Sequence, residues 1–285
     1  MVTSIVVPEK DGWTELAYQM PYFALLRHLN TLNRNGVFDN PEVVNYVYNK
    51  LTNIEAIKNS KILPFRFFEA WKVGEYLPNK IRNALEIALE KSFVNIPKLP
   101  DDVKIIVGTD VSGSMTSFVN KRSVYTFADI AAVLSIAIYK QNPKNTIIIP
   151  FDDKPYTFIP DEFKTMMEMI NWFSKIMGGG TDLGVPVREA LEHNYEADIF
   201  IGVTDNEDWA GHGVMNDLAE YREKVNPDLY AYLIRIDPYV RDTAINIKDP
   251  KNKLIYGWSD QVLKFIALTY NGEAQLDYIN KYLKI

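Results

Sequence analysis

Three short groups of oxygen-bearing side chains stand out in this 285-residue sequence, and their positions predict a shared site. The first is the segment Asp-Val-Ser-Gly-Ser at 110–114, directly after the apolar run 103–109. The second is a Thr-Asp pair after three consecutive glycines, and the third is an aspartate after the apolar run 199–204. Carboxylate and hydroxyl oxygens are the ligands that hard divalent cations prefer. The predicted metal ligands are Asp110, Ser112, Ser114, Thr181 and Asp205.

The composition narrows the choice of metal. The sequence has no cysteine and only three histidines, which disfavours zinc and leaves oxygen-bound cations. We expect Mg²⁺, with Ca²⁺ or Mn²⁺ as alternatives. Most of the predicted ligands are neutral, so a bound cation keeps much of its charge. We therefore expect an anionic oxygen from outside, an Asp or Glu of a protein partner, to complete the coordination.

Simpler interpretations of these residues exist. Asp-x-Ser-x-Ser also arises by chance, and Ser or Asp after a strand often caps a helix. The metal site is favoured because the three groups follow successive predicted structural elements and meet at one edge of a parallel sheet. Glu207, Asp208 and His212 form a second candidate cluster, for which a polar loop is the simpler interpretation. Trp209 and Trp258 fall in predicted loops and are candidate contact residues.

An enzyme is the least favoured class. A metal-dependent hydrolase needs a general base near the strand ends, and Glu207 is the only candidate. The sequence contains no G-x-S-x-G motif, no G-x-x-x-x-G-K-[ST] motif and no G-x-G-x-x-G motif after the first strand. We therefore expect a binding protein.

The hydrophobic pattern changes near residue 100. Before it, apolar residues recur at helical spacing, which predicts four or five packed helices over residues 1–100. The segment 96–100, with two prolines, is typical of a linker. After it, apolar strands alternate with helices, which predicts a doubly wound, mostly parallel α/β sheet over residues 101–285. The expected strands are 103–109, 146–151, 156–159, 199–204, 229–236 and 253–256, and the expected helices are 123–140, 161–174, 184–193, 213–224 and 259–269.

The overall composition is that of an ordinary globular protein. The net charge is −6, and it arises beyond residue 100, since the first hundred residues are nearly balanced. No apolar run reaches the roughly 18 residues of a membrane span. The N-terminus has no basic segment ahead of an apolar stretch, as a secretory signal would. Together with the lack of cysteine, these features lead us to expect a cytoplasmic protein without membrane contact.

The motifs resemble a known family. Asp110-Val-Ser-Gly-Ser114, Gly179-Gly180-Thr181-Asp182 and Val203-Thr204-Asp205 resemble the metal-ion-dependent adhesion site of von Willebrand factor A (vWA) domains. Thr204-Asp205-Asn206-Glu207, with Ala210-Gly211 and Pro186, resembles the Ro ribonucleoprotein (TROVE-module) family in particular. Met20-Pro21, Ala24–Leu29 and Ile62-Leu63-Pro64-Phe65 resemble that family's helical module. The resemblance implies a vWA domain after a helical-repeat segment.

The resemblance also implies an RNA partner. Ro proteins bind small noncoding RNAs and the ends of misfolded RNAs on a ring of helical repeats that the vWA domain closes. The ring needs several times more helical residues than the first hundred residues supply, so we expect only its last helices here and leave open that oligomers rebuild a groove. A structural role in a larger particle is a further alternative. The candidate RNA-binding residues are Arg27, His28, Arg34, Lys61 and Arg66.

Overall fold

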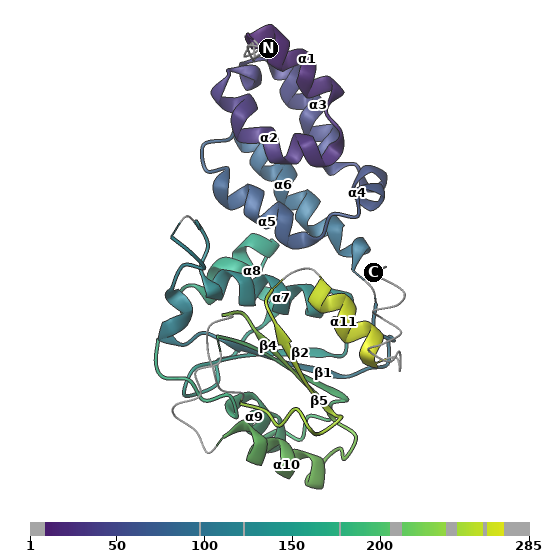
Figure 1. The fold of residues 1–285 in the computed structure, drawn as a ribbon, viewed down its shortest axis with the longest axis vertical. Helices are drawn as coiled ribbons and strands as arrows, with labels where there is room; N and C mark the ends of the chain where they lie inside the picture. The colour runs from purple at the N-terminus through teal and green to yellow at the C-terminus, as the bar shows by residue number, and fades with distance from the viewer. Residues whose placement is uncertain are drawn as a thin grey trace, which may run out of the picture. The chain divides into compact units, whose positions relative to one another are not determined.

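The computed structural model divides the chain into two compact units, Met1–Asn95 and Ile96–Ile285 (Figure 1). The sequence pattern placed this division at residue 100. The structure describes residues 9–96, 98–121, 123–176, 178–205, 213–237, 244–258 and 261–270. Among these residues, no helix combines the length and the apolar character that crossing a membrane requires.

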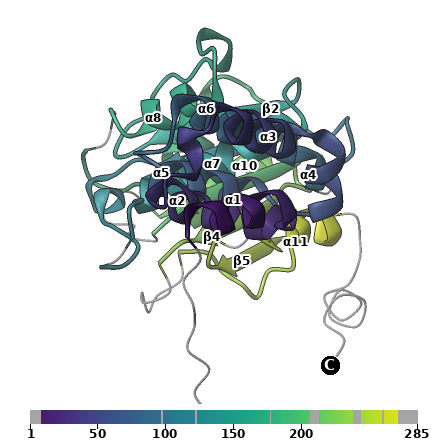
Figure 2. The ribbon, with the colours of Figure 1, turned by 90° about the horizontal axis from the view of Figure 1, so that it is seen from above.

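The described part of the first unit is built from helices alone, which Figure 2 shows from above. The α-helices are α1 (Lys10–Gln19), α2 (Tyr22–Arg34), α3 (Pro41–Thr52), α4 (Ile54–Ser60), α5 (Pro64–Val73) and α6 (Asn79–Lys91). Two short 3₁₀ turns, Val37–Asp39 and Ser92–Asn95, complete it. The expected four or five helices are thus too few. Helices α1 and α4 each bury a single residue, so they carry no apolar stripe that a sequence pattern could reveal.

Local capping and one shared core explain the remaining helices. The Asn40 side chain accepts a hydrogen bond from the backbone amide of Glu42 at the start of α3, where Pro41 takes the first position. Asn53 caps α4 in the same way. The apolar residues at helical spacing are buried, as predicted. They include Leu25, Leu29, Val43, Val47, Leu51, Phe67, Phe68, Ile81 and Leu85.

The second unit is a doubly wound parallel sheet, which confirms the expected fold class. Its five strands lie in the order β2-β1-β3-β4-β5, and every neighbouring pair is parallel. The strands are β1 (Ile105–Asp110), β2 (Thr146–Phe151), β3 (Ile199–Thr204), β4 (Tyr230–Arg235) and β5 (Asn252–Tyr256). Figure 1 shows α7, α8 and α11 on one face of the sheet and α9 and α10 on the other. These helices span Phe127–Gln141 (α7), Met166–Phe173 (α8), Val185–Glu192 (α9), Val214–Lys224 (α10) and Gln261–Tyr270 (α11).

The sheet core explains the unbroken apolar runs. Every residue of β1 and of β3 is buried, because helices cover both faces of these central strands. On the α9–α10 side, Ile106 and Phe200 pack with Leu218 and Tyr221 of α10. Because β1 and β3 are neighbouring parallel strands, their carboxyl ends lie next to each other. The predicted ligands begin at these ends.

The expected edge strand at 156–159 is wrong. Only an isolated antiparallel bridge joins Phe151 to Pro155, and the Tyr156 amide donates one hydrogen bond to the Pro150 carbonyl at 2.8 Å. Pro150 and Pro155 lie at this contact, and neither has an N–H to donate to a β-ladder. The pairing therefore ends after one contact.

Two helices begin later than their apolar patterns indicated. Helix α7 begins at Phe127 and not near 123, and α8 begins at Met166 and not near 161. Each start is set by a capping box, Thr126 with Asp129 and Thr165 with Glu168, in which side chain and backbone bond reciprocally. A single 3₁₀ turn, Pro160–Glu162, takes the place of the first predicted turns of α8.

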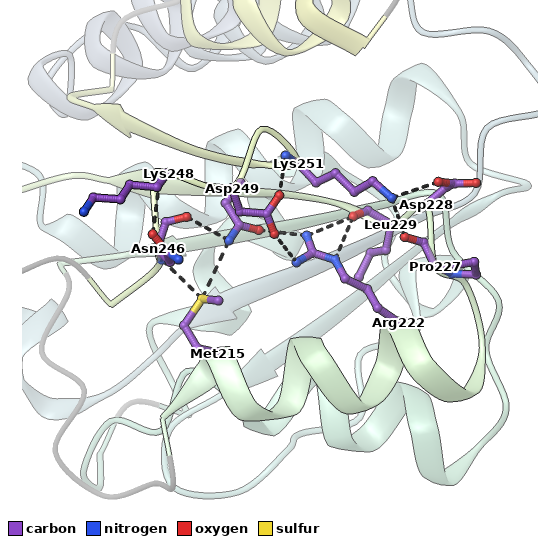
Figure 3. Close-up of polar contacts among 10 residues, drawn as sticks. Met215, Arg222, Pro227, Asp228, Leu229, Asn246, Lys248, Asp249 and Lys251 are labelled. Atoms are coloured by element: carbon purple, nitrogen blue, oxygen red, sulfur yellow. Dashed lines mark hydrogen bonds and ion pairs between the residues drawn. The ribbon is translucent and has the colours of Figure 1, made fainter.

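A partly buried arginine joins α10 to the segments that lead into β4 and β5 (Figure 3). The Arg222 guanidinium donates to the Leu229 carbonyl, to the Asn252 side chain at 2.7 Å and to the Asp249 carboxylate at 3.1 Å. Asn252 in turn donates to the Asn246 carbonyl at 3.0 Å. One cation thus satisfies acceptors on the loop before β4 and on the segment leading into β5.

Replacing this arginine should loosen the second unit. We expect Arg222→Ala to lower the free energy of unfolding by about 2 kcal/mol, because it leaves a half-buried carboxylate and a buried carbonyl without their donor. Denaturant unfolding followed by circular dichroism measures the change. Lys224→Ala, two residues along the same helix, removes only an exposed ion pair with Glu220 and should change little. Equal effects of the two substitutions would contradict the structural role of Arg222.

Candidate metal-binding site

The site begins with a buried carboxylate at the end of β1. Asp110 is the last residue of the strand and is fully buried. One of its oxygens accepts a hydrogen bond from the Ser112 amide at 2.8 Å, and the other accepts one from the Thr204 hydroxyl at 2.5 Å. Thr204 ends β3, the neighbouring parallel strand, so the strand pairing itself brings the two side chains together.

Two serines that follow Asp110 in the chain, Ser112 and Ser114, lie next to each other. The hydroxyls of Ser112 and Ser114 are 3.2 Å apart. Gly113 starts a short 3₁₀ turn, Gly113–Thr116, that reverses the chain after the strand. Ser112 is almost fully buried and Ser114 is partly exposed, so the pair runs from the interior to the surface.

The glycine-rich loop is tied to the same turn by its backbone. The Gly113 amide donates to the Gly179 carbonyl at 3.3 Å, and the Gly178 amide donates to the Val111 carbonyl at 3.1 Å. Gly179 has a φ of 65°, and a Cβ there would lie 2.6 Å from a carboxylate oxygen of Asp152, so only glycine fits. This loop holds Thr181, which is 3% exposed.

Sequence reasoning missed the ion pairs that hold this loop in place. Arg188 of α9 bonds the carboxylate of Asp182 with one nitrogen and that of Asp217 on α10 with another, the latter at 2.7 Å. The second oxygen of Asp182 accepts from the Gly184 amide at 3.0 Å. Asp217 lies in α10, so one arginine connects the glycine-rich loop to that helix. No spacing rule indicated this role, because Asp182 precedes α9 and Asp217 is 29 residues from Arg188.

The electrostatics of the site favour a cation. Burial, with the nearby carboxylate of Asp205, raises the pKa of Asp110 to about 7, against the hydrogen bonds from Ser112 and Thr204, which lower it. The donors to Asp110 are neutral, an amide and a hydroxyl. Two buried carboxylates that repel each other beside two neighbouring hydroxyl oxygens match the needs of an oxygen-liganded divalent ion. The residues present therefore fit Mg²⁺.

The ligand set explains why acidic residues alone do not reveal the site. Among the described residues, no group of three or more His, Asp or Glu side chains is placed to hold a metal ion. A site here depends on hydroxyls for most of its protein ligands. Thr109 adds a buried contact behind it, since its hydroxyl donates to that of Ser135 on α7 at 2.7 Å.

Most of the other candidate residues lie outside the described part of the chain. Glu207, Asp208, His212 and Trp209 fall in residues 206–212, beyond the described ranges. Trp258 is described and is half-buried, with its ring 5.9 Å from that of Tyr125 in an edge-on contact. Trp258 therefore stabilises the neighbouring loop and is less exposed than its loop position indicated.

The candidate RNA-binding residues of the first unit are all exposed, but they do not form one cluster. Arg27 and Arg66 line a groove of about 550 Å³ between α2 and α5, whose floor includes Leu29 and Ala70. The Arg27 guanidinium lies 5.8 Å from the Phe23 ring centroid at the groove, and Arg66 pairs with Glu69 at 3.1 Å. His28, Arg34 and Lys61 do not line it.

Because Asp110 is buried and its pKa is raised, we expect the stability of the second unit to depend on pH. A carboxyl group whose pKa is raised on folding stabilises the fold while protonated, so this contribution is present below the unfolded value near 4 and is lost as pH rises towards 7. Asp110→Asn keeps the hydrogen-bonding shape without the charge. In EDTA, its stability relative to the wild type should therefore rise between pH 5 and pH 8, by about 3 kcal/mol. Thermal unfolding over this range tests it, and identical pH profiles would contradict it.

Comparisons with known proteins agree with this architecture. Residues 104–267 match the Ro60 vWA domain family, and residues 7–73 match the TROVE domain family. A Caenorhabditis elegans protein named RNA-binding protein RO60 is 33% identical over 217 residues, which is 72% of this chain and 33% of that protein. A Deinococcus radiodurans protein of the same name is 30% identical over 203 residues, 66% of this chain and 37% of that protein. The chain thus spans about a third of the length of these curated relatives.

A solved structure shows the same fold. The crystal structure of the Deinococcus radiodurans RO (RSR) protein matches with a TM-score of 0.73 at 21% identity, covering 93% of this chain and 61% of that one. Both curated relatives are named for binding and not for catalysis, in agreement with the expectation of a non-enzyme. Because the Ro60 vWA match alone covers more than half of its residues, this chain belongs to the Ro60 family of TROVE and vWA domain proteins.

Proposed function

We propose that this protein is a Ro-type binding protein whose second unit binds a divalent cation and, through it, an acidic residue of a protein partner. The observation that carries the proposal is the buried Asp110 carboxylate, held by neutral donors beside the paired hydroxyls of Ser112 and Ser114. Thr181 and Asp205 complete the proposed ligand set. Mg²⁺ is the proposed ion, and Ca²⁺ and Mn²⁺ are the alternatives.

The charge balance of the ligands supports binding of an anionic partner. Two carboxylates and three hydroxyls leave a coordination sphere that one further anionic oxygen can complete. The partly exposed Ser114 marks the side of the site that a partner can reach, since Asp110, Ser112 and Thr181 are buried. A bound cation would supply electrostatic attraction for that oxygen, and the protein residues would fix its position.

Titration calorimetry with Mg²⁺ is the direct test. We expect one binding site in the wild type and none in Asp110→Ala, because the substitution removes the carboxylate at the centre of the ligand set. Asp153→Ala is the matched control, since Asp153 is an exposed aspartate just beyond the carboxyl end of the neighbouring strand β2. Loss of binding in both variants, or no binding in the wild type, would refute the proposed site.

We also propose that the first unit binds RNA. The supporting observation is the groove between α2 and α5, which combines two exposed arginines with the exposed ring of Phe23. Cationic side chains attract phosphates, and aromatic rings stack on unpaired bases. The relatives named as RNA-binding proteins support the same partner class. An assembly role in a larger particle remains compatible with both activities.

The salt dependence of RNA affinity tests this second proposal. We expect Arg27→Ala with Arg66→Ala to weaken binding of a stem-loop RNA with a single-stranded 3′ end by about tenfold or more. The slope of log affinity against log salt should fall by roughly one for each lost phosphate contact. Fluorescence anisotropy at two salt concentrations measures both quantities. Lys58→Ala, on an exposed face of α4 away from the groove, is the control, and an equal effect would show that net charge alone matters.

A further inference from the structure

A structured loop directly follows the predicted metal ligands and carries two exposed apolar side chains. After Ser114 the chain makes a tight turn, in which the Ser117 amide donates to the Ser114 carbonyl at 3.0 Å. It then forms a short antiparallel hairpin before α7, in which Phe118 pairs with Thr126. We call the described residues 117–121 and 123–127 the 117–127 hairpin.

Several hydrogen bonds define the shape of the 117–127 hairpin. The Val119 amide donates to the Tyr125 carbonyl at 3.4 Å, and the Phe127 amide donates to the Ser117 carbonyl at 3.1 Å. At the tip, the Ser123 amide donates to the Asn120 carbonyl at 3.0 Å. The hairpin is therefore preorganised, so a partner that binds to it need not order it.

The side chains of the hairpin differ in burial. Tyr125 is buried and meets the ring of Trp258. Phe118 and Val124 are exposed, at 60% and 46%. Single exposed apolar residues are common on proteins, whereas here two lie on one hairpin close to the candidate metal site.

The spacing links these exposed side chains to the candidate metal site. A turn closed by a bond between its first and fourth residues keeps their Cα atoms within about 7 Å, and one more residue adds about 4 Å. The Cα of Phe118 therefore lies within about 11 Å of that of Ser114. An extended peptide covers this distance in about three residues. A segment whose acidic side chain reaches the metal ligands can thus place a nearby side chain on the hairpin.

We propose that Phe118 and Val124 select the partner of the metal site by receiving an apolar side chain one to three positions from its metal-binding Asp or Glu. This inference rests on the proposed metal-dependent function. The exposed Lys121 at the hairpin tip adds attraction for the acidic segment. A protein segment is favoured over RNA because Val124 is aliphatic and offers no flat surface for base stacking.

The test uses two capped six-residue peptides, each with one glutamate, which differ only in a leucine or a glycine two positions after it. Binding is followed by chemical-shift changes in Mg²⁺ and in EDTA. We expect the leucine peptide to bind about tenfold more tightly, as partial burial of one leucine side chain allows. Phe118→Ser with Val124→Ser should abolish this difference and leave the Mg²⁺ affinity and the glycine peptide unchanged. Ile247→Ser is the control, since Ile247 is equally exposed on another loop.

The outcomes separate the inference from the function on which it rests. Equal Mg²⁺-dependent binding of both peptides would overturn the role of the hairpin and leave the metal site intact. A lack of Mg²⁺-dependent binding for either peptide would refute the metal-dependent function, and the inference with it. Tighter binding of an oligouridylate that is lost in the Phe118→Ser variant would also overturn the inference, because the surface would then serve RNA. Thermal unfolding of each variant confirms that the fold is retained.

Discussion

The hydrogen bond between Asp110 and Thr204 is the contact on which the candidate metal site of the second unit depends. The two residues are 94 positions apart in sequence, and they meet because β1 and β3 are neighbours in parallel register. A buried carboxylate is costly unless its oxygens are satisfied. Correct pairing of the central strands therefore satisfies Asp110 and builds the floor of the site in the same step.

The loops around this floor are fastened to one another by bonds that need no metal. Backbone contacts join the turn at Gly113 to the glycine loop at Gly179, and Arg188 joins Asp182 to α10 through Asp217. Such a frame holds the oxygens of the proposed ligands in place without an ion. The charged form of Asp110 stays unfavourable in this frame, since burial and the neighbouring Asp205 carboxylate raise its pKa. Binding energy from a cation would then be gained without large rearrangement.

Local sequence was informative where one short segment decides its own structure. The buried runs of β1 and β3, the apolar stripes of α2 and α3, and the three groups of oxygen ligands were all evident. Where contacts with other segments decide the structure, the pattern of apolar residues gave wrong predictions. The segment 156–159 has strand-forming residues, but the prolines around it remove the donors that a ladder needs. Helices α1 and α4 form with one buried residue each, because neighbouring helices and not their own periodicity stabilise them.

The sequence by itself determined the fold class, the family resemblance and the types of side chain at the strand ends, since each depends on residue order and spacing. Only the tertiary structure decided which of those side chains touch. Thr204 supports Asp110, Arg188 holds the Thr181 loop, and of the five candidate RNA-binding residues only Arg27 and Arg66 share a groove. The physical reason is that contacts between distant segments depend on strand register and helix packing, which no local pattern encodes.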